Sequence, residues 1–222
     1  MSEPFELEVG DRLTGARWDE PSGAWGVFVL AHGAGAGMEH PFLAGVTEGL
    51  GSEGLACLRF EFPYVHAGRR SPDPPAVLLR TWRAACAEGA ARAAGRSLAA
   101  GGKSMGGRIA SMLAAEEGEA FPAGALVFFG YPLHPPGRPE KLRDAHLGGI
   151  LRPMLFIQGT NDALATFGLI SSVVTKLGPR ARLHAVEGGD HSFRVRGAKR
   201  SDAEIGRDLG VLAAGFVREV AG

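Results

Sequence analysis

Short, nearly continuous apolar runs alternate along this chain with segments in which apolar residues recur at helical spacing. Continuous apolar runs that end at glycine-rich turns are typical of strands buried on both faces. The pattern predicts strands at residues 26–31, 55–62, 97–101, 125–129, 154–157 and 182–186. It predicts helices at residues 41–50, 75–94, 104–116, 165–176 and 202–220.

This alternation predicts an α/β protein with a mostly parallel central sheet and helices on both faces. The first 25 residues are expected to add antiparallel strands at one edge of the sheet. Residues 131–149 are rich in proline, glycine and histidine and lack periodicity, so they are interpreted as a loop or small flap. No long insertion interrupts the alternation, so no large lid is expected. The 222 residues are interpreted as a single domain spanning 1–222.

Composition narrows the class of protein. The 24 basic and 24 acidic residues cancel, which argues against a protein that binds nucleic acid or an anionic membrane surface. Cys57 and Cys86 have no metal-ligand spacing and are interpreted as buried free thiols. Neither a metal nor an organic cofactor is expected. The N-terminus lacks a signal-peptide pattern and the apolar runs are too short to span a bilayer, so a cytoplasmic location is expected.

The strongest motif is G-x-S-x-G at residues 102–106, directly after a predicted strand and directly before a predicted helix. A serine in such a strand-to-helix turn is strained and exposed, and its neighbours must be small. Ser104 is therefore the candidate nucleophile. A phosphate-binding loop is the competing interpretation, but it requires a glycine at position 97, where the chain has Ser97.

A serine nucleophile needs a histidine base and an acid that orients the base. Asp162 follows the predicted strand at 154–157, and His191 follows the next one. Both lie at the sheet edge expected for Ser104, so the three are predicted to form a catalytic triad. The competing interpretations are a helix-capping role for Asp162, a surface-loop role for His191, and Asp190 as the acid.

A glycine-rich turn at residues 31–37 ends the first strong strand, and its backbone N–H groups can face the serine. The predicted oxyanion donors are the amides of Met105 and Ala34, with Gly33 or Gly35 as alternatives to Ala34.

The turn at residues 31–37 also partly imitates a dinucleotide-binding turn. Met38 occupies the place of the third glycine of that motif, which argues against a nucleotide. Glu61 nevertheless lies near the place where such a site has its acidic residue.

Six segments together resemble the α/β-hydrolase superfamily, from residue 26 to the C-terminus. They are HGAGAGMEHPF from His32, RFEFPY from Arg59, GGKSMGGR from Gly101, GYPLHPPGRPEKLR from Gly130, FIQGTND from Phe156 and GGDHSF from Gly188. The resemblance is to a small, cap-poor, dienelactone-hydrolase-like group that includes testis-expressed and NSL-complex-subunit homologues. Dienelactone hydrolases proper use a cysteine where this chain has Ser104.

The motifs predict a carboxylesterase-like serine hydrolase that cleaves a small-molecule carboxylic ester or thioester through an acyl-enzyme. Two alternatives remain at this stage: a non-catalytic interaction module with the same fold, and an acyltransferase with the same triad. A homodimer through an edge strand or the terminal helix is compatible with the pattern.

Three arginines lie on or after a strand expected to end near the site. Arg59, Arg69 and Arg70 are candidate ligands for a substrate carboxylate or phosphate. The alternative interpretation is that they are solvated loop residues or form an ion pair with Glu61.

Overall fold

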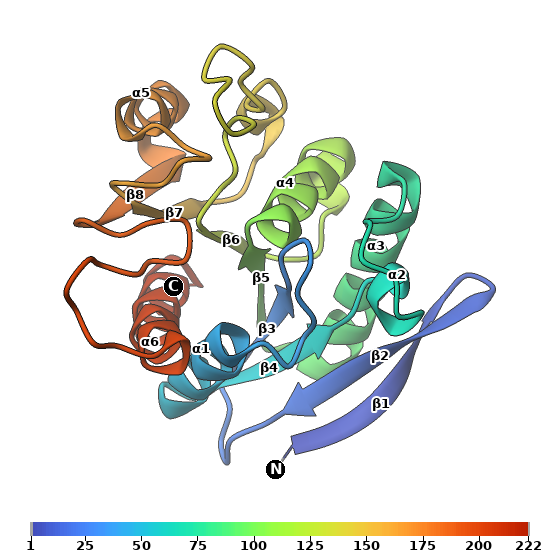
Figure 1. Cartoon of the computed structure of the whole chain (residues 1–222). Coiled ribbons are helices and arrows are strands. Elements are labelled where there is room, and N and C mark those ends of the chain that lie inside the picture. The colour runs from blue at the N-terminus through green and yellow to red at the C-terminus, as the bar shows by residue number, and fades with distance from the viewer. Residues whose placement is uncertain (1, 222) are drawn as a thin grey trace.

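An eight-stranded sheet organises the molecule, as the computed structural model shows for residues 2–221 (Figure 1). The strand order is β1-β2-β4-β3-β5-β6-β7-β8. The strands are β1 (Ser2–Val9), β2 (Arg12–Asp19), β3 (Gly26–Ala31), β4 (Leu55–Phe60), β5 (Ser97–Lys103), β6 (Ala125–Phe129), β7 (Met154–Gly159) and β8 (Ala181–Val186). Strands β3 to β8 are mutually parallel, and β1 and β2 are antiparallel at one edge. The predicted mostly parallel sheet with an antiparallel edge is confirmed.

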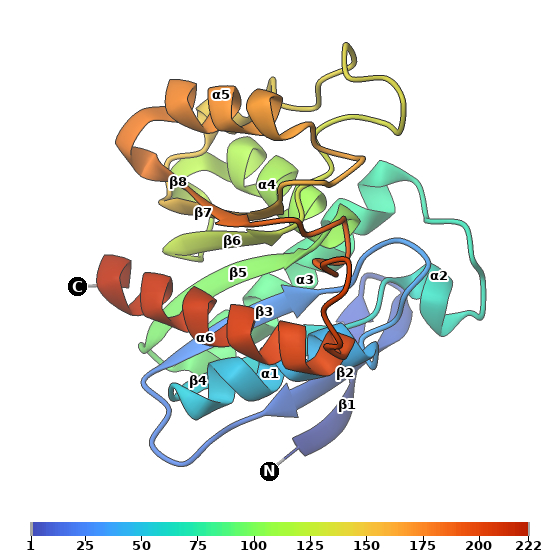
Figure 2. The same cartoon turned by 60° about the vertical axis from the view of Figure 1, so that its left-hand side comes forward.

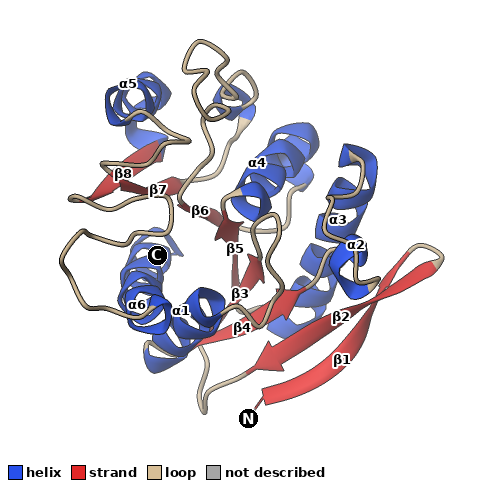
Figure 3. Cartoon of the chain, in the orientation of Figure 1, coloured by secondary structure: helices blue, strands red, loops and turns tan. Residues whose placement is uncertain are grey.

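Helices cover both faces of the sheet (Figures 2 and 3). They are α1 (Pro41–Ser52), α2 (Pro63–His66), α3 (Pro75–Ala93), α4 (Met105–Glu117), α5 (Phe167–Leu177) and α6 (Asp202–Ala221), with single 3₁₀ turns η1 (Gly118–Ala120), η2 (Leu147–Gly149) and η3 (Gly178–Arg180). Among the described residues, no helix combines the length and apolar character that a bilayer span requires.

Strand side chains alternate between two cores, as the pleat of a sheet requires. In β3, Val27 and Val29 join a core with α3, α4 and α5, whereas Phe28 and Leu30 join a core with α1 and α6. Because both faces are covered, the central strands are apolar at almost every position. This burial explains why their sequence shows continuous apolar runs.

The α1–α6 pair crosses at unusually short range because both helices have glycine at the contact. A Cβ atom added at Gly45 would overlap the carbonyl oxygen of Ala203, and one added at Gly206 would overlap the carbonyl oxygen of Phe42. The backbones of the two helices therefore touch directly. This crossing places the first turns of α1 and α6 beside the carboxyl end of the sheet.

Two segments refine the sequence-based expectation. The predicted strand at 55–62 ends at Phe60, and the short helix α2 follows, because Pro63 sets the backbone for a first helical turn. Residues 131–149 are a loop, the first of the two predicted alternatives, with packed ends and exposed residues at 136–142. Tyr131 and Leu147 are fully buried, and the Tyr131 hydroxyl donates to the carbonyl oxygen of Arg143.

Candidate active site

Ser104 sits in a tight turn between β5 and α4. Its backbone has φ 50° and ψ −115°, a positive-φ conformation that is strained for a residue with a Cβ. Its N–H donates to the carbonyl oxygen of Phe129 at 3.0 Å, which ties the turn to β6. A Cβ at Gly102 would lie 2.7 Å from the Ala31 carbonyl oxygen, and one at Gly106 would lie 2.5 Å from that of His32. Glycine at both positions lets the turn approach the end of β3.

Three side chains from separate strand ends meet at this turn. The Nε2 atom of His191 lies 2.9 Å from the Ser104 Oγ, and its Nδ1 lies 2.7 Å from the Asp162 Oδ2. Asp162 follows β7 and its side chain is fully buried, whereas the His191 side chain is 28% exposed. The structure therefore brings together the three residues that the sequence predicted to be neighbours.

Asp162 is held by donors on both carboxylate oxygens. Its Oδ1 accepts from the Leu164 N–H at 2.7 Å, and its Oδ2 accepts from the Gln158 side chain at 2.5 Å as well as from His191. Gln158 is itself fixed, because its Oε1 accepts from the Tyr131 N–H at 2.9 Å. Sequence reasoning missed Gln158. A lone amide at the end of the apolar strand β7 was the available signal.

The neighbouring acid, Asp190, has a different role. Its Oδ1 accepts from the backbone N–H groups of Ser192 and Arg194, so it shapes the turn that presents His191. The His191 ring hydrogen-bonds to Asp162 instead. The structure thus favours Asp162 over Asp190 as the partner of the imidazole.

Lys103 lies directly before Ser104 and holds the His191 backbone in position through a hydrogen bond. Its ammonium donates to the carbonyl oxygen of His191 at 2.6 Å and lies 5.2 Å from the centre of the Phe193 ring. Burial lowers the pKa of Lys103 to about 8, and the negative charges of Asp162 and Asp190 oppose that shift. Lys103 is therefore largely charged at neutral pH. The direction of this side chain could not be inferred from sequence.

The turn after β3 is locked by His32, whose ring is fully buried. The ring Nδ1 lies 2.8 Å from the Gly33 carbonyl oxygen and must donate to it, while Nε2 accepts from the Phe62 N–H at 3.0 Å. A single neutral tautomer satisfies both bonds. Burial lowers the pKa of His32 to about 4, with the Gly33 hydrogen bond opposing the shift. The turn that carries Ala34 thus depends on a neutral imidazole.

His32 is expected to make folding stability fall on acidification. Its pKa is about 4 in the folded state and 6.5 when unperturbed, so the unfolded chain binds more protons between these values. Stability contributed by His32 is therefore complete above pH 6.5 and is lost as pH falls toward 4. We expect about 2 kcal/mol of this loss between pH 7 and pH 4.5.

Urea unfolding of the wild type and His32→Gln at both pH values measures this contribution. The variant is expected to show a smaller pH-dependent loss of unfolding free energy than the wild type. His184→Gln, at an exposed position on β8, is the matched control and should retain the wild-type dependence. Equal pH dependence in the wild type and His32→Gln would contradict the assignment.

A cavity of about 160 Å³ opens beside Ser104 and His191. Its lining combines small, apolar and polar side chains from the turn after β3, the first turn of α1, the Ser104 turn, the His191 segment and the start of α6: Gly33, Ala34, Ala36, His40, Phe42, Leu43, Lys103, Ser104, His191, Ser192 and Asp202. Its volume is below the range usual for drug-sized ligands. The loop at 131–149 contributes no residue to this lining, which corrects its interpretation as a flap over the site.

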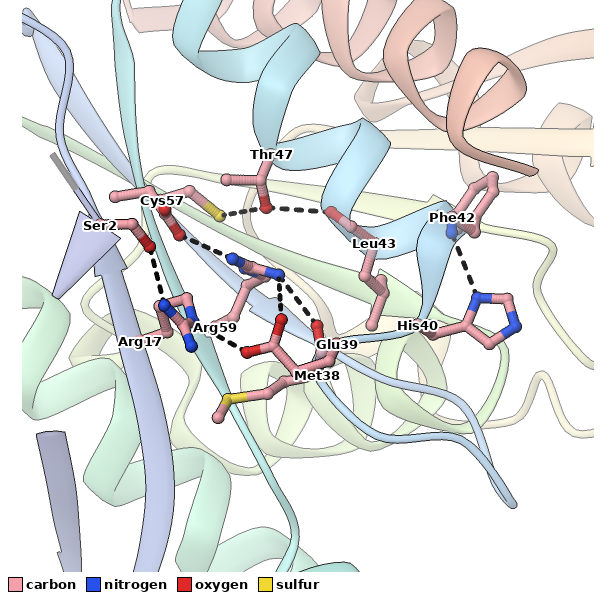
Figure 4. Close-up of polar contacts among 11 residues, drawn as sticks. Ser2, Arg17, Met38, Glu39, His40, Phe42, Leu43, Thr47, Cys57 and Arg59 are labelled. Carbon is pink, nitrogen blue, oxygen red and sulfur yellow. Dashed lines mark hydrogen bonds and ion pairs between the residues drawn. The ribbon is translucent and has the colours of Figure 1, made fainter. Parts of the chain in front are cut away.

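The arginines predicted to bind substrate lie elsewhere. Arg59 is 5% exposed, and its guanidinium donates to Asp19 at 2.9 Å. It also donates to the Met38 carbonyl oxygen at 3.0 Å (Figure 4). Glu39, rather than Glu61, is its second acidic neighbour, at 3.6 Å. Arg59 therefore joins β2 and β4 to the segment that leads into α1, and it has no contact with the Ser104 cavity. The substrate-binding expectation for Arg59 is corrected accordingly.

The other two predicted arginines lie on the surface loop after α2. Arg69 is paired with Asp73 at 2.6 Å, which is the ordinary role of a loop arginine. Arg70 is exposed and lies outside the lining of the cavity. Neither position supports the predicted contact with substrate.

Comparison with known proteins agrees with this fold. A family described as "Alpha/beta hydrolase domain" matches residues 25–218. The chain therefore belongs to the α/β-hydrolase family. Family and fold together support hydrolase activity.

Solved structures extend the likeness over the whole chain. A dienelactone hydrolase from Anabaena variabilis is 22% identical, with a TM-score of 0.76 over 99% of this chain and 97% of that one. The esterase Est1E from Butyrivibrio proteoclasticus is 16% identical, with a TM-score of 0.73 over 98% of each chain. A serine hydrolase without a lid from Xanthomonas campestris is 17% identical, with a TM-score of 0.71 over 99% of this chain and 93% of that one.

Proposed function

We propose that this protein is a serine carboxylesterase whose catalytic triad is Ser104, His191 and Asp162. One observation carries the proposal: the series Ser104 Oγ–His191–Asp162 has hydrogen-bond distances of 2.9 and 2.7 Å in the order that nucleophilic catalysis requires. The strained turn of Ser104 supports the same role, because it presents the hydroxyl at the start of a helix.

In the proposed mechanism, His191 Nε2 takes the proton of Ser104 as Oγ attacks the acyl carbonyl carbon. Asp162 holds the imidazole in the tautomer whose Nε2 can accept that proton, and it stabilises the imidazolium. The developing oxyanion receives hydrogen bonds from the backbone amides of Met105 and Ala34. Ala34 lines the same cavity as Ser104, and Met105 is the first residue of α4.

Collapse of this tetrahedral intermediate expels the alcohol, which takes the proton from His191 and leaves Ser104 acylated. Water then attacks the acyl-enzyme with His191 as base, and the second collapse releases the acid and restores the serine hydroxyl. Every proton in this cycle passes through one ring nitrogen, so the cycle needs no group beyond the triad and the two amides.

The cavity beside Ser104 supports a short-chain acyl substrate. A volume of about 160 Å³ is small, and Phe42 and Leu43 give one wall an apolar surface. Among the structural neighbours, Est1E has also been solved with ferulic acid bound. For this chain we propose short, neutral acyl esters first and thioesters second.

Labelling with a fluorophosphonate probe tests the proposal, together with hydrolysis of nitrophenyl acetate and butyrate. The wild type is expected to be labelled and to turn over both esters, and Ser104→Ala is expected to lose labelling and at least about 10³-fold of the turnover. Ser192→Ala is the matched control, because Ser192 lines the same cavity without bonding to the His191 ring. Absence of labelling and turnover in folded wild-type protein would overturn the esterase proposal and favour an interaction module.

A further inference from the structure

A second cavity, of about 440 Å³, lies between α3, α4 and the segment that leads into η2. Its lining residues are Leu79, Arg108, Met112, Ala115, Glu116, Ala145, His146 and Gly149. It shares none of these residues with the cavity beside Ser104. We call this second cavity the α4 groove. Leu79, Met112 and Ala115 form its apolar floor, and Arg108, in the first turn of α4, and Glu116, in the last, carry its charges.

Arg108 is the central polar group of the α4 groove. It is half-buried, and within residues 2–221 its guanidinium forms no ion pair or hydrogen bond. Its Nε is fully shielded from solvent and lacks an acceptor. The half-buried Arg92 and Arg96, by contrast, are paired with Glu88 and Glu20. A buried donor without a partner destabilises the fold. The unpaired guanidinium of Arg108 is therefore suited to donate to an acceptor on a bound ligand.

A second guanidinium reinforces the positive charge. Burial and the nearby charge of Arg108 both lower the pKa of Arg143, whose side chain likewise bonds to no residue in the described chain. The Arg143 carbonyl oxygen accepts from the Tyr131 hydroxyl, which lies 3.4 Å from Nε2 of the groove residue His146. Arg143 therefore borders the groove without lining it, and the charges of the two unpaired guanidinium groups repel each other. An anion bound between them would relieve that repulsion.

His146 lines the α4 groove with an uncharged imidazole ring. Its Nε2 lies 2.8 Å from Ser111 Oγ, and that hydroxyl donates to the Arg108 carbonyl oxygen at 2.7 Å, so Nε2 must carry a proton. Burial lowers the pKa of His146, and the charge of Arg108 lowers it further. These bonds fix the ring beside the guanidinium without neutralising it.

The acidic residues nearby do not cancel this charge. Glu116 lines the α4 groove, but its carboxylate pairs with Arg83 at 3.3 Å. Asp144 is near enough to raise the pKa of His146 and opposes the effect of Arg108, yet across the described residues it forms no ion pair with either guanidinium. The guanidinium donors of Arg108 and Arg143 consequently remain available.

We propose that the α4 groove is a second ligand site, which binds the phosphate or carboxylate group of a small amphipathic molecule. The anion accepts hydrogen bonds from Arg108, with Arg143 as the second cation. The apolar part of the ligand packs on Leu79, Met112 and Ala115 along the groove floor.

Calorimetric titration with phenyl phosphate, benzoate and neutral benzamide tests the proposal and distinguishes the two anions. The wild type is expected to bind at least one anionic probe saturably and benzamide far more weakly, with affinity that falls as salt rises. Arg108→Gln is expected to bind that anion roughly tenfold or more weakly, and Arg143→Gln to weaken it by a smaller factor. Binding is measured without turnover, so the result is independent of the esterase proposal.

Arg138→Gln is the matched control, because Arg138 belongs to the same loop and is exposed on the surface, whereas Arg143 is half-buried beside the groove. It should bind as the wild type does. Thermal unfolding of each variant verifies that it is folded. Two outcomes would overturn the proposal: no saturable binding of either anion to the wild type, or equal affinity in Arg108→Gln, Arg143→Gln and the control.

Discussion

Asp162→Asn is expected to lower kcat for short-chain esters by roughly 10³- to 10⁴-fold with little change in KM. The reason lies in the three donors that surround the carboxylate. Leu164 N–H donates to Oδ1, and Gln158 and His191 both donate to Oδ2. An asparagine side chain has one oxygen and one NH₂ group. At one of the two carboxylate positions, the NH₂ group would therefore face groups that now donate to Asp162.

If the asparagine oxygen faces Leu164, its NH₂ faces the Nδ1 atom of His191. That ring nitrogen must then accept, and the proton moves to Nε2, where it blocks transfer from Ser104. Steady-state kinetics of the wild type and variant measure the loss. Asp190→Asn is the matched control, because its single carbonyl oxygen still accepts the two backbone N–H groups that Asp190 now holds. A kcat within tenfold of the wild type in Asp162→Asn would contradict the triad assignment.

Gly206→Ala is expected to destabilise the fold by about 3 kcal/mol, which corresponds to a Tm decrease of about 6–12 °C. A Cβ atom at this position overlaps the Phe42 carbonyl oxygen and lies 3.0 Å from the Val46 nitrogen, both in the backbone of α1. A helix backbone cannot move aside as a flexible side chain can. The two helices must therefore separate and lose apolar contact along their crossing.

Gly215→Ala, in the same helix, separates this effect from helix propensity. A Cβ at Gly215 would meet nothing within 4 Å, so alanine there is expected to stabilise the helix by about 0.5–1 kcal/mol. Thermal and urea unfolding of both variants provide the comparison. A Gly206→Ala variant as stable as the wild type would show that the α1–α6 contact is looser than the structure indicates.

Much of the fold and the order of the candidate triad followed from local sequence. Apolar runs identified β3, β6 and the start of β7, because a strand covered on both faces needs apolar residues throughout. The positions of Ser104, Asp162 and His191 after successive parallel strands predicted that they would meet. Parallel strands end at one edge of the sheet, so this juxtaposition is a consequence of topology.

The roles of side chains that depend on distant partners could not be predicted from the sequence. Gln158 and Lys103 gain their roles from contacts with Asp162 and with the His191 backbone, which lies 88 positions along the chain from Lys103. Arg59 was assigned to substrate because its strand ends near the site, but its side chain turns toward Asp19 and Met38. The charge of an arginine is visible in sequence, whereas its direction depends on which carboxylate the fold places beside it.

The sequence by itself determined the parallel sheet, the glycine-rich turns and the chain order of the three candidate catalytic residues. These features depend on side-chain periodicity and on local backbone conformation, which neighbouring residues control. Only the tertiary structure decided that Gln158 holds Asp162, that Arg59 is buried, and that Arg108 is left unpaired within the described residues. Those outcomes depend on hydrogen bonds and charges between segments far apart in the chain, and folding alone brings such segments together.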